Sequence, residues 1–315
     1  ALFLALGAVA VAATYYIDDN SNDGDVYTPG FTGNDANNGL SPTAPKLTLN
    51  NLLASTNLLP GDIVLIDTGT YTNNVVIGTG VNGMAGNPIL FQGSPSTRPW
   101  GGGTIFNPTG GNVFDIRGRY LHFRDIQAVG GGVGFNLTGS SFGEYERIYC
   151  ISNNANGVSA SGASNSNAFR RCVFRPISFA GISSYAPVKG NYLENSISWA
   201  PNSIGIISES GAFSNIVGNI LLGQYASAGG IYAPSAASYN LLWGSVATVS
   251  LNETLAELQR INTNWVGNTV ADPKFVNAEG FDFHLLSAAG FVSNGVWVTN
   301  AAVGFSPGID LGPRE

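Results

Sequence analysis

Charged side chains are scarce in this 315-residue chain: Asp, Glu, Lys and Arg together make up 10% of it, against roughly 25% in an ordinary soluble domain. The solvent faces of helices usually carry those charges, so their shortage favours a β-rich surface covered by Asn, Ser, Thr and Gly. Basic residues are outnumbered by acidic ones, 13 to 20, which gives a net charge of −7. Because no basic stripe is available for phosphates, we expect no nucleic-acid partner.

Cysteine and long apolar segments are also limited. Two cysteines, Cys150 and Cys172, are too few for a disulfide framework or a zinc cluster. An apolar run of 13 residues opens the sequence, whereas a spanning helix needs about 20. This run resembles a signal-peptide core, which predicts a secreted, extracellular or cell-surface protein. Alternatively, it is an assembly strand that adds to a neighbouring copy. The assembly residues would be Ala1, Leu2, Phe3, Leu4, Leu6, Val9 and Val11.

Glycine, in contrast, is abundant, at 42 residues, and part of it is regularly spaced. Five glycines before short apolar stretches are separated by 23, 24, 24 and 25 residues: Gly134, Gly157, Gly181, Gly205 and Gly230. In a second series, Asp, Cys, Ser or Asn precedes an aliphatic residue with steps of 25, 22, 24, 23 and 21: Asp125-Ile126, Cys150-Ile151, Cys172-Val173, Ser196-Ile197, Asn219-Ile220 and Asn240-Leu241. Two series with one period indicate a repeating unit.

Each repeat contains three short β-prone segments separated by Gly, Asn, Ser or Pro, and none is long enough for a helix. The leucine pattern of leucine-rich repeats is absent, and a propeller blade needs roughly 40 residues. The sequence therefore predicts an all-β fold, a right-handed parallel β-helix with three-strand coils of about 24 residues.

The ends of such a solenoid need caps. Leucines at near-helical spacing over Leu47 to Leu59 predict a short capping helix, and Glu253 to Ile261 predicts a second helical segment. We expect an apolar N-terminal segment at 1–13, a loop and capping helix at 14–62, a solenoid at 63–250 and an irregular C-terminal cap at 251–315.

Several segments carry a family resemblance. The segments Tyr16 to Asp18, Gly33 to Pro42 and Pro60 to Tyr71 look like the opening of bacterial pectin-lyase-like β-helix proteins. The segments Asp272 to Val276 and Ser306 to Gly312 are similar to the closing part of secreted β-helix surface proteins with variable C-terminal anchors. The resemblance implies the fold and says little about activity, because this superfamily includes lyases, glycosidases, adhesins and structural proteins.

Arginines provide the candidate catalytic residues. Arg124, Arg147 and Arg171 are 23 and 24 residues apart and should stack in successive coils, with Arg170 and Lys189 nearby. Such a column could hold an acidic polysaccharide, and lyases of the family use basic residues to neutralise the sugar carboxylate and remove its α-proton. Alternatively, the arginines pair in a salt-bridge ladder with four acidic residues: Asp125, Glu144, Glu146 and Glu194.

Two further groups invite a structural or metal role. The acidic turn with Asp18, Asp19, Asp23 and Asp25 offers the hard oxygen ligands of a weak calcium site, or it is a plain solvated turn. We predict that no cofactor is required, and calcium is the one candidate ligand. Cys150 and Cys172 fall at one phase of adjacent coils, so they either form a disulfide or fill buried positions.

Together these features favour an extracellular structural protein that assembles with copies of itself into a filament or surface coat. The alternative is a polysaccharide lyase, or another carbohydrate-active enzyme, acting on an acidic polysaccharide. Whether the protein is an enzyme is left open, with the structural role preferred because no complete catalytic set is evident.

Overall fold

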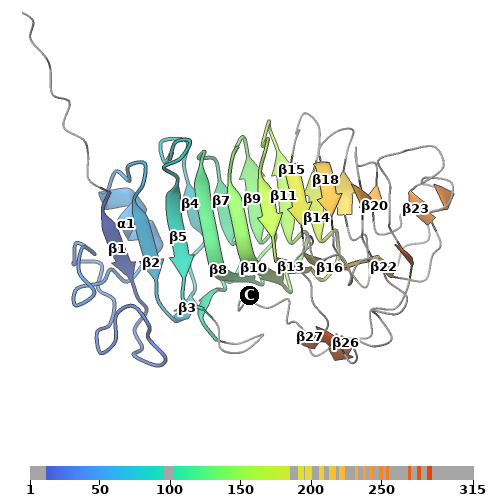
Figure 1. Ribbon diagram of the computed structural model, residues 1–315. Helices are drawn as coiled ribbons and strands as arrows, with labels where there is room; N and C mark the ends of the chain where they lie inside the picture. The colour runs from blue at the N-terminus through green and yellow to red at the C-terminus, as the bar shows by residue number, and fades with distance from the viewer. Residues whose placement is uncertain are drawn as a thin grey trace, which may run out of the picture.

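The computed structural model describes residues 12–95, 102–184, 191–194 and 196–200, and beyond these it describes individual strands only. The strands pair in parallel into three ladders, and each coil contributes one strand to each ladder. The predicted parallel β-helix with three-strand coils is therefore confirmed. Figure 1 shows the coils following one another along an elongated molecule, with α1 (Leu49–Ser55) near its N-terminal end.

Ladders 1 and 2 join into one 16-stranded sheet because β8 (Leu121–Val129) and β10 (Glu144–Ile151) each run through both. Ladder 1 also contains β1 (Thr14–Ile17), β2 (Ile63–Ile66), β5 (Ile89–Gly93), β12 (Ala168–Arg170), β15 (Asn191–Glu194), β18 (Phe213–Val217) and β21 (Ala237–Ser238). Ladder 2 also contains β3 (Gly69–Tyr71), β6 (Thr104–Phe106), β13 (Val173–Arg175), β16 (Ile197–Ala200), β19 (Ile220–Gly223), β22 (Leu241–Trp243) and β25 (Thr269–Val270). Ladder 3 contains β4 (Val75–Ile77), β7 (Phe114–Ile116), β9 (Phe135–Thr138), β11 (Val158–Ser161), β14 (Ile182–Ser184), β17 (Ile206–Ser208) and β20 (Ile231–Tyr232).

The phased glycines mark ladder 3. The residues that directly follow them pair in sequence from coil to coil: Phe135, Val158, Ile182, Ile206 and Ile231. A Cβ on Gly134 would lie 2.6 Å from the carbonyl oxygen of Gly157, and a Cβ on Gly157 would lie 2.6 Å from that of Gly181. Glycine is used here because the backbone of one coil approaches the next too closely for a side chain.

The second sequence series is only partly in register. Val173, Ile197, Ile220 and Leu241 pair as predicted. Ile151, however, pairs with Val129 and Arg175. The coils differ in length. A constant period therefore assigns the wrong register partner to residues that follow a coil one or two residues longer or shorter. This error matters for the cysteines and arginines below.

Aromatic side chains fill the interior of ladder 1. Phe91, Phe123, Tyr145 and Phe169 occupy one register column, and their ring centroids are 4.8, 5.4 and 4.7 Å apart. All four side chains are almost fully buried. Stacked pairs of this kind contribute about 0.5–1.5 kcal/mol each beyond their apolar burial. The column therefore holds neighbouring coils in one register.

The N-terminal cap is built around α1. Thr48 is its N-cap and accepts a hydrogen bond from the Asn51 N–H. Asp35 holds the approach to the helix by accepting from the Leu47 and Thr48 N–H groups. Leu49 and Leu52 are buried, so the short helix covers the first coil. The capping helix predicted within Leu47 to Leu59 is confirmed, although it is shorter.

The C-terminal region differs from the prediction where it is described. Glu253 and Thr254 form β24, which pairs antiparallel with β23 (Thr248–Ser250), so no helix begins at Glu253. Its backbone groups bond across the hairpin instead. β25 extends ladder 2 beyond residue 250, and β26 (Phe275–Asn277) pairs antiparallel with β27 (Asp282–Leu285). The apolar residues 1–11, including the seven assembly residues, lie outside the described residues, and the assembly role stays a prediction.

Candidate functional site

A one-residue bend separates ladder 1 from ladder 2 in the central coils. Asp125, Arg147 and Arg171 occupy this bend, each with φ between 52° and 56°. Arg147 donates from Nε and Nη2 to the two oxygens of Asp125 at 2.7 and 2.9 Å, and from Nη1 to Glu146 at 2.6 Å. The Asp125 side chain is only 3% exposed. This bidentate pair is part of the scaffold, so Arg147 is not available to a ligand.

The predicted arginine column does not form, because the register partner of Arg124 is Glu146 and not Arg147. Arg124 Nε lies 3.1 Å from Glu146 Oε2, and Arg171 Nη1 lies 3.7 Å from Glu146 Oε1. Arg170 Nη1 lies 3.9 Å from Glu144 Oε1. The described residues thus have the alternating charges of the salt-bridge ladder. Lys189 lies outside the described residues.

A groove runs along the outer face of ladder 1 beside these charges. We call it the central groove; it has a volume of about 510 Å³ and is lined by Met84, Ala85, Gly86, Pro88, Tyr120, His122, Phe142, Gly143, Glu144, Ser166, Ala168 and Arg170. The loop at 84–88 forms one wall. Hydrogen bonds fix its ends: Gly83 N–H donates to Arg119 O at 3.0 Å, and Ile89 N–H donates to Tyr120 O at 3.1 Å.

The central groove has an aromatic edge. The rings of Tyr120 and Phe142 stack at 4.7 Å with an interplanar angle of 10°. Both residues have positive φ, and Phe142 is 43% exposed. An exposed, rigid ring at the edge of a polar groove offers an apolar face to a flat ligand such as a sugar ring.

His122 and Glu144 provide proton chemistry in the central groove. They are register partners, and His122 Nε2 lies 3.7 Å from Glu144 Oε2. Burial lowers the pKa of His122, and the charges of Arg124 and Arg170 lower it further, while Glu144 opposes them. The imidazole is therefore neutral at pH 7 and can accept a proton.

The charge of the central coils is opposite to that of the whole chain. Between residues 102 and 184 there are seven arginines against two aspartates and two glutamates. Residues 12–95 contain one lysine and seven aspartates. The central coils therefore suit an anionic ligand, and the N-terminal cap repels one.

The acidic loop of the cap is organised by Asp67, which the sequence analysis did not single out. Its carboxylate accepts hydrogen bonds from the backbone N–H groups of residues 26–28 and from the Thr28 hydroxyl. These donors satisfy the oxygens of the buried Asp67 carboxylate. The loop thus folds around one carboxylate.

Asp18 and Asp25 have buried oxygens without hydrogen-bond partners: Asp18 Oδ1 and both oxygens of Asp25. Burial raises the pKa of Asp18 to about 7 and that of Asp25 to about 6, and the neighbouring carboxylates add to both effects. In the described part of the chain, no group of three His, Cys, Asp or Glu side chains is arranged to hold a metal ion. Calcium at Asp18, Asp19, Asp23 and Asp25 stays a prediction from sequence that the geometry does not strengthen.

The candidate disulfide is absent, since Cys150 and Cys172 are both free and buried. Cys150 pairs in register with Phe174, because the coil is longer than the spacing assumed from sequence. The Cys172 thiol donates to the carbonyl oxygen of Tyr145 at 3.3 Å. Burial raises the pKa of Cys172 to about 12, so the thiol is protonated and fills a core position.

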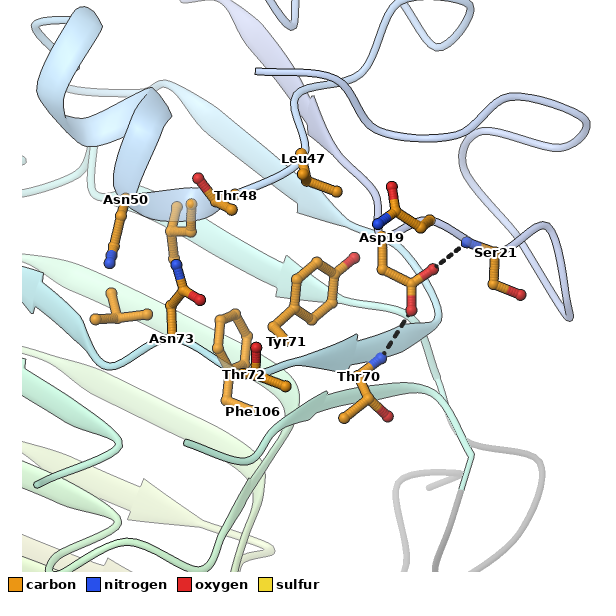
Figure 2. Close-up of a pocket in the computed structure, with 13 residues that line it drawn as sticks. Asp19, Ser21, Leu47, Thr48, Asn50, Thr70, Tyr71, Thr72, Asn73 and Phe106 are labelled. Carbon is orange, nitrogen blue, oxygen red and sulfur yellow. Dashed lines mark hydrogen bonds between the residues drawn. The ribbon is translucent and has the colours of Figure 1, made fainter. Parts of the chain in front are cut away.

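A second pocket, the N-terminal cleft, lies between α1, the loop at 19–21 and the first coil (Figure 2). Its volume is about 460 Å³, and it is lined by Asp19, Asn20, Ser21, Leu47, Thr48, Leu49, Asn50, Thr70, Tyr71, Thr72, Asn73, Val75 and Phe106. None of these lining residues is a lysine, arginine or histidine. The cleft and the central groove thus differ in charge.

Comparisons with known proteins yield similarities of structure. No protein-family model matches the sequence, and no curated protein matches it. The structure is similar to that of pectate lyase Pel9A, at 15% identity over 85% of this chain and 84% of that chain, with a TM-score of 0.48. It is also similar to a rhamnogalacturonan lyase, at 16% identity over 84% and 91% of the two chains, with a TM-score of 0.46. A third similar structure is a mannuronic acid specific family 6 lyase from human gut microbiota, at 16% identity over 62% and 52%, with a TM-score of 0.44. At these values the similarity says nothing about activity, which depends on the side chains of the groove.

The central groove was not predicted from the sequence, although a signal for it exists. Tyr120 and Phe142 are 22 residues apart, as are His122 and Glu144. That spacing is one coil in this part of the solenoid. A search for aromatic and titratable residues at coil spacing would have brought these four side chains together.

Proposed function

We propose that this protein is a polysaccharide lyase that binds an acidic polysaccharide in the central groove. The observation that carries the proposal is a neutral, half-buried imidazole beside an arginine in a groove on positively charged coils. A lyase needs these two functions close together: a cation for the sugar carboxylate and a base for the adjacent proton.

The reaction would be a β-elimination on a uronic-acid unit. Arg170 would pair with the carboxylate and make the proton on the neighbouring carbon more acidic. His122 would accept that proton through Nε2. A carbon–carbon double bond forms next to the carboxylate as the glycosidic carbon–oxygen bond breaks, and the leaving oxygen takes a proton from water.

The remaining parts of the groove would position the polymer. The exposed ring of Phe142, supported by Tyr120, would stack on a sugar ring. Glu144, whose Oε2 lies 3.7 Å from His122 Nε2, would stabilise the positive charge of the imidazole after it has taken the proton. A polymeric substrate also implies that the protein works outside the cell; no helix in the described part of the chain is long and apolar enough to cross a membrane.

The test is an ultraviolet assay for the new double bond, with alginate, pectate and glycosaminoglycans as substrates. We expect product from at least one of them. His122→Asn should lower the rate by at least about 100-fold, and Arg170→Gln should raise KM and lower kcat. Arg117→Gln is the matched control, because it removes the same charge from the same coils outside the groove. If the wild-type protein forms no product from any of these polymers, the proposal is wrong.

The pH profile gives a second readout. Because the base must be deprotonated and its pKa is lowered, the rate should fall only below about pH 6.5. If the rate already falls on acidification at a pH clearly above about 6.5, His122 is excluded as the base.

A further inference from the structure

The N-terminal cleft has a composition that differs from that of the central groove in a chemically useful way. Amide and hydroxyl side chains dominate its polar lining, and a single carboxylate, Asp19, is its only ionisable acid. Leu47, Leu49 and Val75 add apolar surface. A ligand of this cleft must therefore be rich in hydroxyl or amide groups and carry no negative charge.

The carboxylate of the cleft is held rigidly. Asp19 Oδ1 accepts a hydrogen bond from the Ser21 N–H at 2.7 Å, and Oδ2 accepts one from the Thr70 N–H at 2.9 Å (Figure 2). Each oxygen keeps a second lone pair for a further donor. Such a carboxylate is preorganised to accept hydrogen bonds from ligand hydroxyl groups, since its position is already fixed before binding.

One acceptor in the cleft lacks a partner. The Asn50 amide nitrogen donates to the carbonyl oxygen of Asn74 at 2.7 Å, which fixes the orientation of the amide. Its Oδ1 is buried and has no hydrogen-bond partner. A buried acceptor left unsatisfied costs about 1–3 kcal/mol. Figure 2 shows Asn50 extending from the first turn of α1 toward the segment that carries Asn73. Its Oδ1 is covered by protein atoms, so Asn50 shapes the wall of the cleft and does not present this oxygen to a ligand.

We propose that the N-terminal cleft binds a neutral sugar unit. Asp19 would accept hydrogen bonds from sugar hydroxyls, and the Asn73 side chain at the exposed rim would donate and accept them. The volume of about 460 Å³ lies within the usual range for small-ligand pockets. The Asp19 carboxylate and the excess of aspartates over lysine in residues 12–95 would repel a uronic acid, whereas they do not repel a neutral sugar.

This second site is independent of the lyase chemistry, because it shares no residue with the central groove. It would let the protein hold a neutral part of a mixed polysaccharide, or a neighbouring neutral polymer, while the charged coils act on acidic units. Binding to the cleft should therefore be insensitive to salt.

The experiment is isothermal titration calorimetry of the full chain with named probes: cellotetraose, mannotetraose and galactotetraose as neutral sugars, and tetragalacturonate as the anion. We expect at least one neutral sugar to bind in the millimolar range or more tightly. Asn73→Trp, which fills the exposed rim, should weaken this binding at least about tenfold. Thr72→Trp is a second filling variant at an exposed position.

Val76→Trp is the matched control, because Val76 is exposed on β4 and does not line the cleft; it should leave binding unchanged. Tetragalacturonate should still bind to the Asn73→Trp variant if it binds in the central groove. The proposal is overturned if none of the three neutral sugars binds, or if both filling variants bind them as well as the wild-type protein.

Discussion

Replacing Asp18 by Asn should stabilise the protein above neutral pH. The Asp18 side chain is fully buried, one of its oxygens has no partner, and the other accepts a hydrogen bond from the Thr28 hydroxyl at 3.0 Å. Its pKa lies at about 7, against an ordinary value of 3.8. The folded chain therefore keeps a proton at pH 5 that the unfolded chain releases. Asn preserves the shape and the neutrality of the protonated side chain.

The size of the effect follows from proton linkage. Because the folded state binds the extra proton between pH 3.8 and about 7, the free energy of unfolding falls as the pH rises through that window and is lowest above it. The full pKa difference corresponds to roughly 4 kcal/mol. Roughly 2–3 kcal/mol of this is lost between pH 5 and pH 8. The Asn variant does not lose it.

Urea unfolding followed by circular dichroism at the two pH values would measure this difference. The stability gain of Asp18→Asn over the wild-type protein should grow by roughly 2–3 kcal/mol from pH 5 to pH 8. His122 titrates in both proteins, so its contribution cancels in the comparison. Asn22→Ser, which changes an uncharged side chain at an exposed position of the same loop, should show no such growth. A gain that is the same at both pH values would refute a buried proton on Asp18.

Three other outcomes are expected from the coil packing. Gly157→Ala should lower the free energy of unfolding by about 1–3 kcal/mol in thermal or urea unfolding, because the new Cβ would lie 2.6 Å from Gly181 O. Gly110→Ala is the control, because its Cβ meets nothing within 4 Å. Equal losses of stability in the two variants would contradict the close approach of the coils at Gly157. Arg147→Ala should lower the free energy of unfolding by about 3–5 kcal/mol, because it leaves the buried Asp125 charge without its partner. Adding Asp125→Ala should recover part of that stability. If the stability losses of the two single variants simply add in the double variant, the two side chains do not stabilise each other. Both cysteine thiols are buried, so they should react with iodoacetamide only after the protein unfolds. Mass spectrometry would measure the modification. Rapid modification of the folded protein would contradict the burial of the thiols.

The fold was predictable because its strongest signal is steric. Gly134 and Gly157 stand where one backbone approaches the next, and only glycine fits such positions. The helix over Leu49–Ser55 was also predictable, since Thr48 caps it and its leucines are buried. These features depend on local spacing and on one repeated contact, both of which are visible in a single sequence.

The side-chain arrangement of the coils was harder to predict because it depends on register. A change of one or two residues in coil length moved Cys150 beside Phe174 and placed Glu146 beside Arg124. The residue-level errors therefore have one cause, although the average period was right. The Asp67 centre of the cap was missed for another reason: it joins residues about 40 positions apart, and no repeat relates them.

The register column that contains Arg124, Glu146 and Arg170 has a consequence for how this solenoid can change in length. Positive and negative residues take turns there, so inserting or removing a single coil would bring two residues of like sign into neighbouring positions. Inserting or removing two coils at once would keep opposite signs adjacent. Although the backbone repeats with every coil, the electrostatics of this face therefore favour growth in steps of two.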